Sequence, residues 1–323
     1  MDAVFFEHLE LRMAKYNLDV GSGSHAEQTG KMLIGIEKVL REESPDVVLV
    51  EGDTNTVLAG ALAAVKLGIR VGHVEAGLRS YDRQMPEEIN RVLADHCSDL
   101  LFAPTEKSKR ILLGEGIREE KIFVTGNTIV DAVYQNLEIS KKKVNVLDCL
   151  GVDNGGYFLA TVHRQENVDN KKKFKGILEG LEMVQKEFGL PVVYPIHPRA
   201  KKQFKVFNLK VKGVKIVEPL DYLSFLQLAS NAKLILTDSG GVQEEACILR
   251  VPCVTVRYNT ERPETLEVGS NVLAGTDPYE IIENVKLMLN HRNKWQNPLG
   301  DGKAGERIVH TLKKRFSVLY ARM

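Results

Sequence analysis

Acidic side chains follow two short apolar runs in the first half of the chain. Asp53 comes soon after the run VVLV at 47–50, and Glu75 directly follows the run RVGHV at 70–74. If both runs are neighbouring parallel strands, the two carboxylates lie at the carboxyl edge of a sheet, where open α/β sheets bind ligands. Carboxylates gathered there can transfer protons or stabilise a developing positive charge. For Asp53 alone, capping of the next helix is the alternative.

Two further acids, Glu87 and Glu88, follow Pro86 at the start of a helical pattern. Proline is favoured at the first helical position, and the helix dipole stabilises acids in the first turn. The local pattern therefore favours a structural role for both glutamates.

The stretch TDSGGVQEEA at 237–246 is typical of a turn that binds a diphosphate. Gly240 and Gly241 lie between a strand and a helix, so phosphate oxygens can approach the backbone N–H groups of the helix N-terminus. Glu244 and Glu245 follow one turn later, where a carboxylate can accept hydrogen bonds from ribose hydroxyls. The alternative is an ordinary Asp or Ser cap followed by acids. The fingerprints of NAD-binding and P-loop proteins are not matched, which argues against both classes.

Histidine and arginine side chains follow three strands of the second half. ATVHRQEN carries His163 and Arg164, YPIHPRAK carries His197, and NTERPE carries Arg262. A lone histidine is usually an ordinary polar residue, but two at strand ends with arginines close by favour the binding of an anion. Aromatic side chains in DYLSFLQL at 221–228 could stack on a base, although helix packing explains them as well.

Parallel strands alternating with helices must position these residues, because β-branched runs and helical patterns alternate along the whole chain. The sequence therefore predicts an α/β protein with two Rossmann-like domains. Strands are expected at 46–50, 70–74, 100–104 and 122–126, and then at 157–162, 191–196, 214–218, 233–237, 252–256 and 271–275.

The domain boundary is expected where the strand signal is weak, between residues 138 and 156. This assigns residues 1–148 to a first domain with the acids and 149–323 to a second domain that binds the nucleotide. The KKK run at 141–143 is interpreted as a solvated helix end. The pattern at 305–319 predicts a final helix, which we expect to pack on one of the domains.

Residues 1–45 show helical or loop patterns only. The strand that normally opens a doubly wound domain, with its ligand-facing loop, is therefore not among the predicted strands. We expect the first domain to be incomplete at its N-terminus.

Composition excludes several classes of protein. The chain has 323 residues, 43% apolar and 27% charged, with a formal charge of +1, which gives no support to binding of nucleic acid or of a membrane surface. No run of about 18 apolar residues suggests a membrane helix, and no signal peptide is recognisable. The cysteines are widely spaced, so we expect buried thiols in a reducing cytoplasm and neither disulfides nor a metal site. The cysteines are Cys97, Cys149, Cys247 and Cys253.

Taken together, the motifs resemble those of the non-hydrolysing UDP-N-acetylglucosamine 2-epimerases. The matching stretches, in order, are GDTNT, GHVEAGLRS, MPEEINR, FAPTE, TGNTIVDA, TVHRQEN, YPIHP, TDSGGVQEEA and TERPE, which span about residues 46 to 320. The resemblance implies the GT-B fold, two Rossmann-like domains facing across a cleft, in a homodimer. It also implies interconversion of UDP-N-acetylglucosamine and UDP-N-acetylmannosamine for cell-surface polysaccharides. The sequence indicates no metal or redox cofactor. In bacterial members the substrate is also an activator.

The resemblance assigns roles to individual residues. It implies that the catalytic residues are Asp53, Glu75, Glu87 and His163, so that Glu87 gains a role on resemblance alone while Glu88 stays structural. It implies that the UDP-binding residues are Arg164, His197, Phe225, Ser239, Gly240, Gly241, Glu245 and Arg262.

The chain departs from the family pattern at two places. The family begins with a strand and a G-T-R-P-E loop that reaches the nucleotide phosphates, and this chain has no such segment; Gln165 stands where many bacterial members have a second arginine. Two alternatives therefore remain. One is a different enzyme, a hydrolysing 2-epimerase or a GT-B glycosyltransferase, and the other is an inactive nucleotide-sugar binder.

Overall fold

The computed structural model describes residues 6–290 and 295–320. By their contacts, the residues form two units: unit 1 comprises the chain up to Asp131 and from Leu299 on, and unit 2 comprises Ala132–Pro298. The boundary between the two units lies inside helix α6 (Thr128–Lys143), upstream of the expected boundary at residues 148 and 149. A continuous helix carries no break in composition that would reveal such a boundary. The KKK run is the exposed end of this helix, as predicted.

Unit 1 contains a sheet of four parallel strands in the order β1-β2-β3-β4. All four lie where the sequence predicts them, and no described residues pair as a strand with the outer edge of β1. The strands are β1 (Val47–Glu51), β2 (Arg70–Val74), β3 (Leu100–Ala103) and β4 (Ile122–Val124). In the described residues before 46, the structure has helix and loop only, which confirms the expectation for that part.

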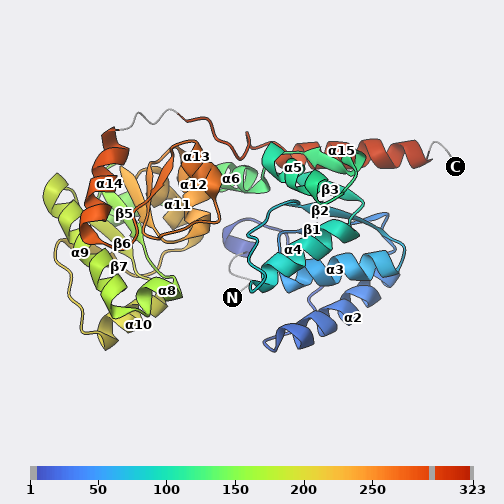
Figure 1. The fold of residues 1–323 in the computed structure, drawn as a ribbon, viewed down its shortest axis with the longest axis horizontal. Helices are drawn as coiled ribbons and strands as arrows, with labels where there is room; N and C mark the ends of the chain where they lie inside the picture. The colour runs from blue at the N-terminus through green and yellow to red at the C-terminus, as the bar shows by residue number, and fades with distance from the viewer. Residues whose placement is uncertain (1–5, 291–294, 321–323) are drawn as a thin grey trace. The chain divides into compact units, whose positions relative to one another are not determined.

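Helices cover both faces of this sheet (Figure 1). Alternate residues of a strand point to opposite faces: Val50 and Val71 pack with α3, whereas Val74 and Phe102 pack with the final helix. The expected packing of that helix is thus seen on the sheet of unit 1. The helices of unit 1 are α2 (His25–Glu43), α3 (Asn55–Lys66), α4 (Pro86–Cys97), α5 (Glu106–Gly114), the short 3-10 helix η1 (Glu119–Lys121) and α15 (Ala304–Tyr320).

Unit 2 contains six parallel strands in the order β10-β9-β8-β5-β6-β7. All six predicted strands are present. They are β5 (Phe158–Thr161), β6 (Val192–Pro195), β7 (Val214–Val217), β8 (Leu234–Thr237), β9 (Cys253–Thr255) and β10 (Asn271–Leu273). The chain runs outward from β5 to β7 and then returns to the other side of β5 with β8. Loops after β5 and β8 diverge at this switch point, where doubly wound sheets bind ligands.

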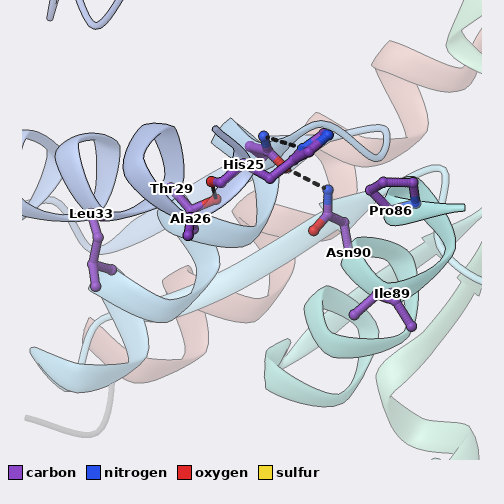
Figure 2. A pocket seen from close by; sticks show the side chains of 9 residues that line it. His25, Ala26, Thr29, Leu33, Pro86, Ile89 and Asn90 are labelled. Carbon is purple, nitrogen blue, oxygen red and sulfur yellow. Dashed lines mark hydrogen bonds between the residues drawn. The ribbon is translucent and has the colours of Figure 1, made fainter. Parts of the chain in front are cut away.

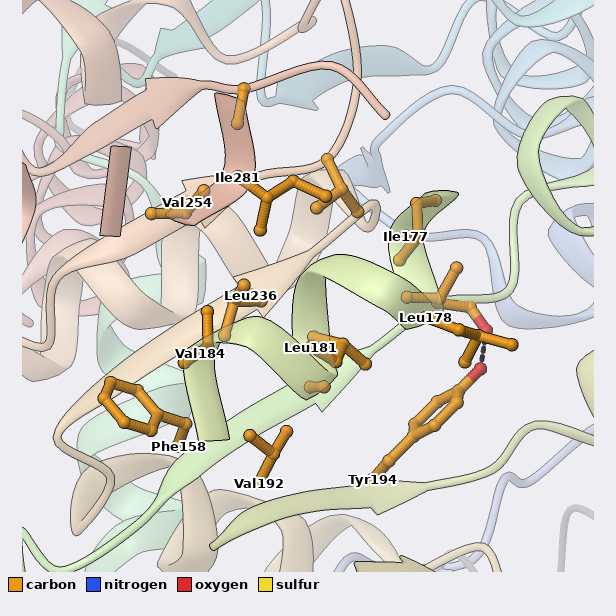
Figure 3. Packing of buried hydrophobic residues seen from close by; sticks show 14 of the residues in the cluster. Phe158, Ile177, Leu178, Leu181, Val184, Val192, Tyr194, Leu236, Val254 and Ile281 are labelled. Atoms are coloured by element: carbon orange, nitrogen blue, oxygen red, sulfur yellow. Dashed lines mark hydrogen bonds between the residues drawn. The ribbon is translucent and has the colours of Figure 1, made fainter. Parts of the chain in front are cut away.

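Two apolar layers enclose the sheet of unit 2. Figure 3 shows the larger one, in which Leu181 and Ile281 pack against strand residues such as Phe158 and Leu236. The second layer joins α7, α11 and α12 to the other face. The helices of unit 2 are α7 (Val146–Leu150), α8 (Gln165–Val168), α9 (Lys171–Phe188), α10 (Pro198–Val206), α11 (Tyr222–Ser230), α12 (Gly240–Leu249), α13 (Pro263–Glu267) and α14 (Pro278–Asn290), with most of α6.

The cysteines are all unpaired, but only two are buried as expected. Cys247 and Cys253 lie in the core of unit 2, Cys97 is half-buried, and Cys149 is exposed. The expectation of a buried thiol is wrong for Cys149, because it lies on the outer side of the short helix α7. In the part of the chain that the structure describes, no helix has the length and apolar character needed to span a membrane.

Candidate active site

Asp53 lies at the carboxyl end of β1 and forms an ion pair rather than a helix cap. Thr54 is the N-cap of α3, so capping by Asp53 is the wrong interpretation. The Asp53 carboxylate instead accepts from Arg91 at 2.6 Å, and its carbonyl accepts from Asn90 at 2.9 Å. Both partners belong to α4, which therefore fixes where this acid points.

Glu75 ends the neighbouring strand in a strained backbone conformation. Its φ of +69° is uncommon for a residue other than glycine, and such strain is often retained at functional sites. A Cβ atom placed on Gly52 would lie 3.6 Å from Oε2 of Glu75. The Glu75 carboxylate therefore lies against the residue that precedes Asp53. The structure thus brings the two acid-bearing segments together, as we predicted from the expectation that β1 and β2 are neighbouring parallel strands.

Glu87 lies half-buried in the first turn of α4. The same helix holds Asp53 through Asn90 and Arg91, one turn further on. The three acids predicted to be catalytic are thus carried by three segments of unit 1 that contact one another.

Glu88 is a structural residue, as predicted. It is buried and accepts from the backbone N–H groups of Ser80 and Tyr81, and from Arg91. Burial would raise the pKa of the Glu88 carboxyl, but these hydrogen bonds outweigh burial and hold the pKa below its usual range. Glu88 therefore ties the loop between β2 and α4 to the arginine that holds Asp53.

A buried polar network beneath the acids was missed by the sequence motifs. His73 on β2 contacts Asp95 on α4 at 2.7 Å, and Arg79 joins Asp95 to Glu115. The side chains of His73, Asp95 and Arg79 are at most 1% exposed. A histidine inside the apolar run RVGHV is a signal that could have identified this network, because a buried ring needs polar partners.

Asp238 organises the loop after β5 in unit 2. Its fully buried carboxylate accepts from the backbone N–H groups of His163 and Arg164 at 3.0 Å each, and from Asn167. Nδ1 of the His163 ring lies 3.2 Å from the same carboxylate. This contact directs the opposite edge of the ring, with Nε2, away from Asp238. The carbonyl of Val162, just before His163, accepts from the buried Tyr194 hydroxyl. Figure 3 draws this hydrogen bond as the dashed line at Tyr194.

His197 presents a hydrogen-bond donor from the end of β6. Its Nδ1 accepts from the backbone N–H of Arg199, so a proton on the neutral ring belongs to Nε2. Burial lowers the pKa of His197, and the charges of His163 and Arg199 lower it further. The two histidine rings have centroids 5.4 Å apart, so the predicted anion-binding residues are brought together.

Ser239, Gly240 and Gly241 form the start of α12. Ser239 caps the helix by accepting from Val242, as the alternative interpretation proposed. A Cβ atom on Gly240 would lie 3.8 Å from the Arg164 guanidinium and 3.7 Å from Oε2 of Glu261, so this ion pair reaches the helix N-terminus. Backbone N–H groups, a helix dipole and an arginine converge there, an arrangement that suits a phosphate.

Two buried glutamates lie one turn into α12. Glu244 pairs with Arg262 at 2.9 Å, and Glu245 accepts a hydrogen bond from Tyr222. Burial raises the pKa of Glu245 to about 7, although the Tyr222 hydrogen bond acts in the opposite direction. Burial also raises the pKa of Glu244. Phe225, on the same helix as Tyr222, is half-buried against the apolar core, and its stacking on a base stays a prediction.

A hollow of about 440 Å³ lies beside the acid-bearing segments of unit 1 (Figure 2). Most of its lining is apolar, with Leu33 and Ile89 on facing helices. Its polar side is formed by His25, Asn55 and Asn90, which are linked by hydrogen bonds. Among the described residues, no group of three or more histidine, cysteine or acidic side chains could hold a metal ion.

Two units with parallel sheets, one with acids at its strand ends and one with a diphosphate-type turn, define the GT-B class of nucleotide-sugar enzymes. The family model described as UDP-N-acetylglucosamine 2-epimerase matches residues 1–313. The chain belongs to this family.

Relatives agree with the family match. A UDP-N-acetylglucosamine 2-epimerase of Methanocaldococcus jannaschii is 61% identical over 97% of this chain and 87% of the relative. One of Methanococcus maripaludis is 55% identical over 96% of this chain and 87% of the relative. The solved structure of the Methanocaldococcus jannaschii enzyme in complex with UDP-GlcNAc and UDP has a TM-score of 0.83 and is 60% identical, covering 97% of this chain and 88% of that one.

Proposed function

We propose that this chain interconverts UDP-N-acetylglucosamine and UDP-N-acetylmannosamine without net hydrolysis. The observation that carries the proposal has two parts. In unit 1, the Glu75 carboxylate lies against Gly52, the residue before Asp53. In unit 2, His163, His197 and Arg164 gather beside the N-terminus of α12. Proton transfer at the sugar needs the acids. Re-addition, as opposed to hydrolysis, needs groups that retain the departing UDP.

The reaction we propose proceeds by elimination. The C2 hydrogen of the sugar has no adjacent carbonyl to acidify it, so the anomeric C–O bond breaks first or concurrently and its electrons leave with UDP. A carboxylate removes the C2 proton, and the electrons of that C–H bond form the C1=C2 double bond of a glycal. Reprotonation of C2 on the opposite face and re-addition of UDP at C1 complete the inversion. Two faces require two proton-transfer groups.

The residues divide between these steps. We assign proton transfer and stabilisation of the cationic stage to Asp53, Glu75 and Glu87, and assistance to the leaving diphosphate to His163. The ion pair between Asp53 and Arg91 fixes the direction in which that carboxylate points. We assign binding of UDP to the set Arg164, His197, Phe225, Ser239, Gly240, Gly241, Glu245 and Arg262. The Nε2 donor of His197 and the N-terminus of α12 support contacts to phosphate.

Proton NMR of the reaction in heavy water tests the proposal. We expect UDP-N-acetylmannosamine to accumulate from UDP-N-acetylglucosamine, with deuterium at C2 of both sugars and UDP remaining attached. Formation of free N-acetylmannosamine and UDP as the only products would establish a hydrolysing enzyme instead. Binding of UDP without any exchange at C2 would establish a nucleotide-sugar binder.

We further propose that the chain acts as a homodimer in the cytoplasm, that UDP-N-acetylglucosamine is also an activator, and that the product serves cell-surface polysaccharides. The unpaired cysteines support a reducing compartment. Light scattering at micromolar concentration tests the dimer. Initial rates from UDP-N-acetylmannosamine, with and without traces of the epimer, test activation.

A further inference from the structure

Asp95 connects two of the three segments of unit 1 that carry the proposed acids, the loop after Glu75 and helix α4. Its Oδ2 accepts from the backbone N–H of Gly77 at 3.1 Å, in the loop that follows Glu75. Its Oδ1 lies 2.7 Å from Nδ1 of His73. Asp95 itself belongs to α4, the helix whose first turn carries Glu87.

His73 extends this connection to the third acid. Its Nε2 lies 2.9 Å from the carbonyl oxygen of Gly52, the residue before Asp53. A carbonyl can only accept, so Nε2 donates, and the contact between Nδ1 and Asp95 completes a connection from α4 to the β1 loop. Gly52 has a φ of +82°, so the backbone turns sharply where His73 holds it.

Neither side chain can touch a substrate. His73 and Asp95 are at most 1% exposed, and Arg79 closes the outer side of Asp95 at 2.7 Å. Their effect on chemistry must therefore pass through the backbone groups that they hold. A displacement of about 1 Å at reacting groups can lower a rate about 100-fold. Hydrogen bonds that fix the positions of the acids can therefore affect the reaction rate.

We infer that His73 and Asp95 are positioning residues that set the relative placement of Asp53, Glu75 and Glu87. This inference rests on the proposed catalytic role of those acids. It goes beyond that role because it assigns an effect on the reaction rate to two buried residues that do not contact the substrate. The contact of His73 with the Gly52 carbonyl is the part that conveys position to Asp53.

Two substitutions of His73 separate its contacts. In His73→Asn, the amide nitrogen can take the place of Nδ1 and keep Asp95 satisfied, but nothing reaches the Gly52 carbonyl. In His73→Gln, the longer amide can take the place of Nε2 and hold Gly52, but Asp95 loses its contact with residue 73 and keeps those with Gly77 and Arg79. The matched control is Asp99→Asn, because the Asp99 carboxylate accepts from Val71 at the opposite end of the same strand.

The measurements are kcat and KM for epimerisation, the affinity for UDP and the thermal midpoint of each variant. We expect kcat of His73→Asn to fall about 10- to 100-fold per folded molecule, with UDP affinity within twofold of the wild type. We expect His73→Gln to lose less than fivefold and Asp99→Asn less than twofold. A purely structural role predicts losses that follow the thermal midpoints, and that result would overturn the inference.

If His73→Asn does not fold, His73→Gln decides the matter. A loss of fivefold or more in kcat would overturn the inference, whereas a loss below fivefold supports it. Failure of the proposed function is distinguishable, because the wild-type chain would then show no C2 exchange at all.

Discussion

At the scale of single residues, both units use a buried aspartate to shape a loop that carries proposed site residues. Asp238 accepts from two backbone N–H groups after β5, and Asp95 accepts from Gly77 after β2. Neither aspartate belongs to the set predicted from the sequence to contact the substrate. A carboxylate that accepts several hydrogen bonds from backbone groups fixes their geometry more strongly than any single side-chain contact. The positions of the proposed catalytic groups thus depend on two aspartates that are not assigned to substrate binding.

The raised pKa of Glu245, about 7, predicts a pH dependence of stability. The native state binds this proton more tightly than the unfolded chain, so the stabilising contribution is complete below about pH 4.5 and is lost as the pH rises through about 7. The size is on the order of 3 kcal/mol. We expect Glu245→Gln to gain stability relative to the wild type at pH 8 but little at pH 4.5, measured as thermal midpoints. The exposed Glu280 provides the control substitution, Glu280→Gln. Parallel pH profiles for wild type and Glu245→Gln would contradict the prediction.

At the scale of elements, the order and type of the strands could be predicted because each is a short apolar run between helical patterns. Contacts made by polar side chains could not. In the sequence, Asp53 lies between a strand and a helix, where a helix cap is expected. Only the structure shows that α4 lies close enough for Arg91 to pair with the Asp53 carboxylate. The boundary inside α6 was missed because a helix that passes from one unit to the other looks like any amphipathic helix.

The residues of the candidate site could be proposed from the sequence to the same degree. Glycines, acids and cations at strand ends identify residues such as Gly240 and Glu75, because parallel strands end at a common edge. The residues that hold the loops of the candidate site in place are His73, Asp95 and Asp238. They are buried polar residues whose partners are distant in sequence. Such pairs have no local spacing pattern.

The turn after β2 depends on a glycine. Gly77 has a φ of +82°, and a Cβ atom there would lie 2.5 Å from the carbonyl oxygen of Ser108 on α5. We expect Gly77→Ala to cost at least about 2 kcal/mol in the free energy of unfolding, from backbone strain and the clash together. The control is Gly114→Ala at the end of α5, where nothing lies within 4 Å; we expect it to be neutral or stabilising by up to about 1 kcal/mol. Equal changes in the free energy of unfolding of the two variants, measured in urea, would contradict the prediction that the contact between Gly77 and Ser108 makes alanine unfavourable.

At the scale of the whole molecule, the chemistry is divided between the units. Unit 1 carries the acids proposed to move the C2 proton, and unit 2 carries the groups proposed to bind and release the diphosphate. The net charge of +1 is therefore uninformative about the site, because local clusters of opposite sign cancel in the sum. We expect substitutions of the unit 1 acids to lower the rate of C2 exchange and to leave UDP affinity unchanged.

The central claim is that UDP leaves the sugar and returns during each inversion. Positional isotope exchange tests it most directly, with ¹⁸O placed in the oxygen that bridges C1 and the β-phosphorus. Once UDP is released, the β-phosphate can rotate, so we predict that the label moves to non-bridging positions at a rate comparable to epimerisation, as followed by phosphorus NMR. Complete inversion at C2 with the label still bridging would contradict the elimination mechanism.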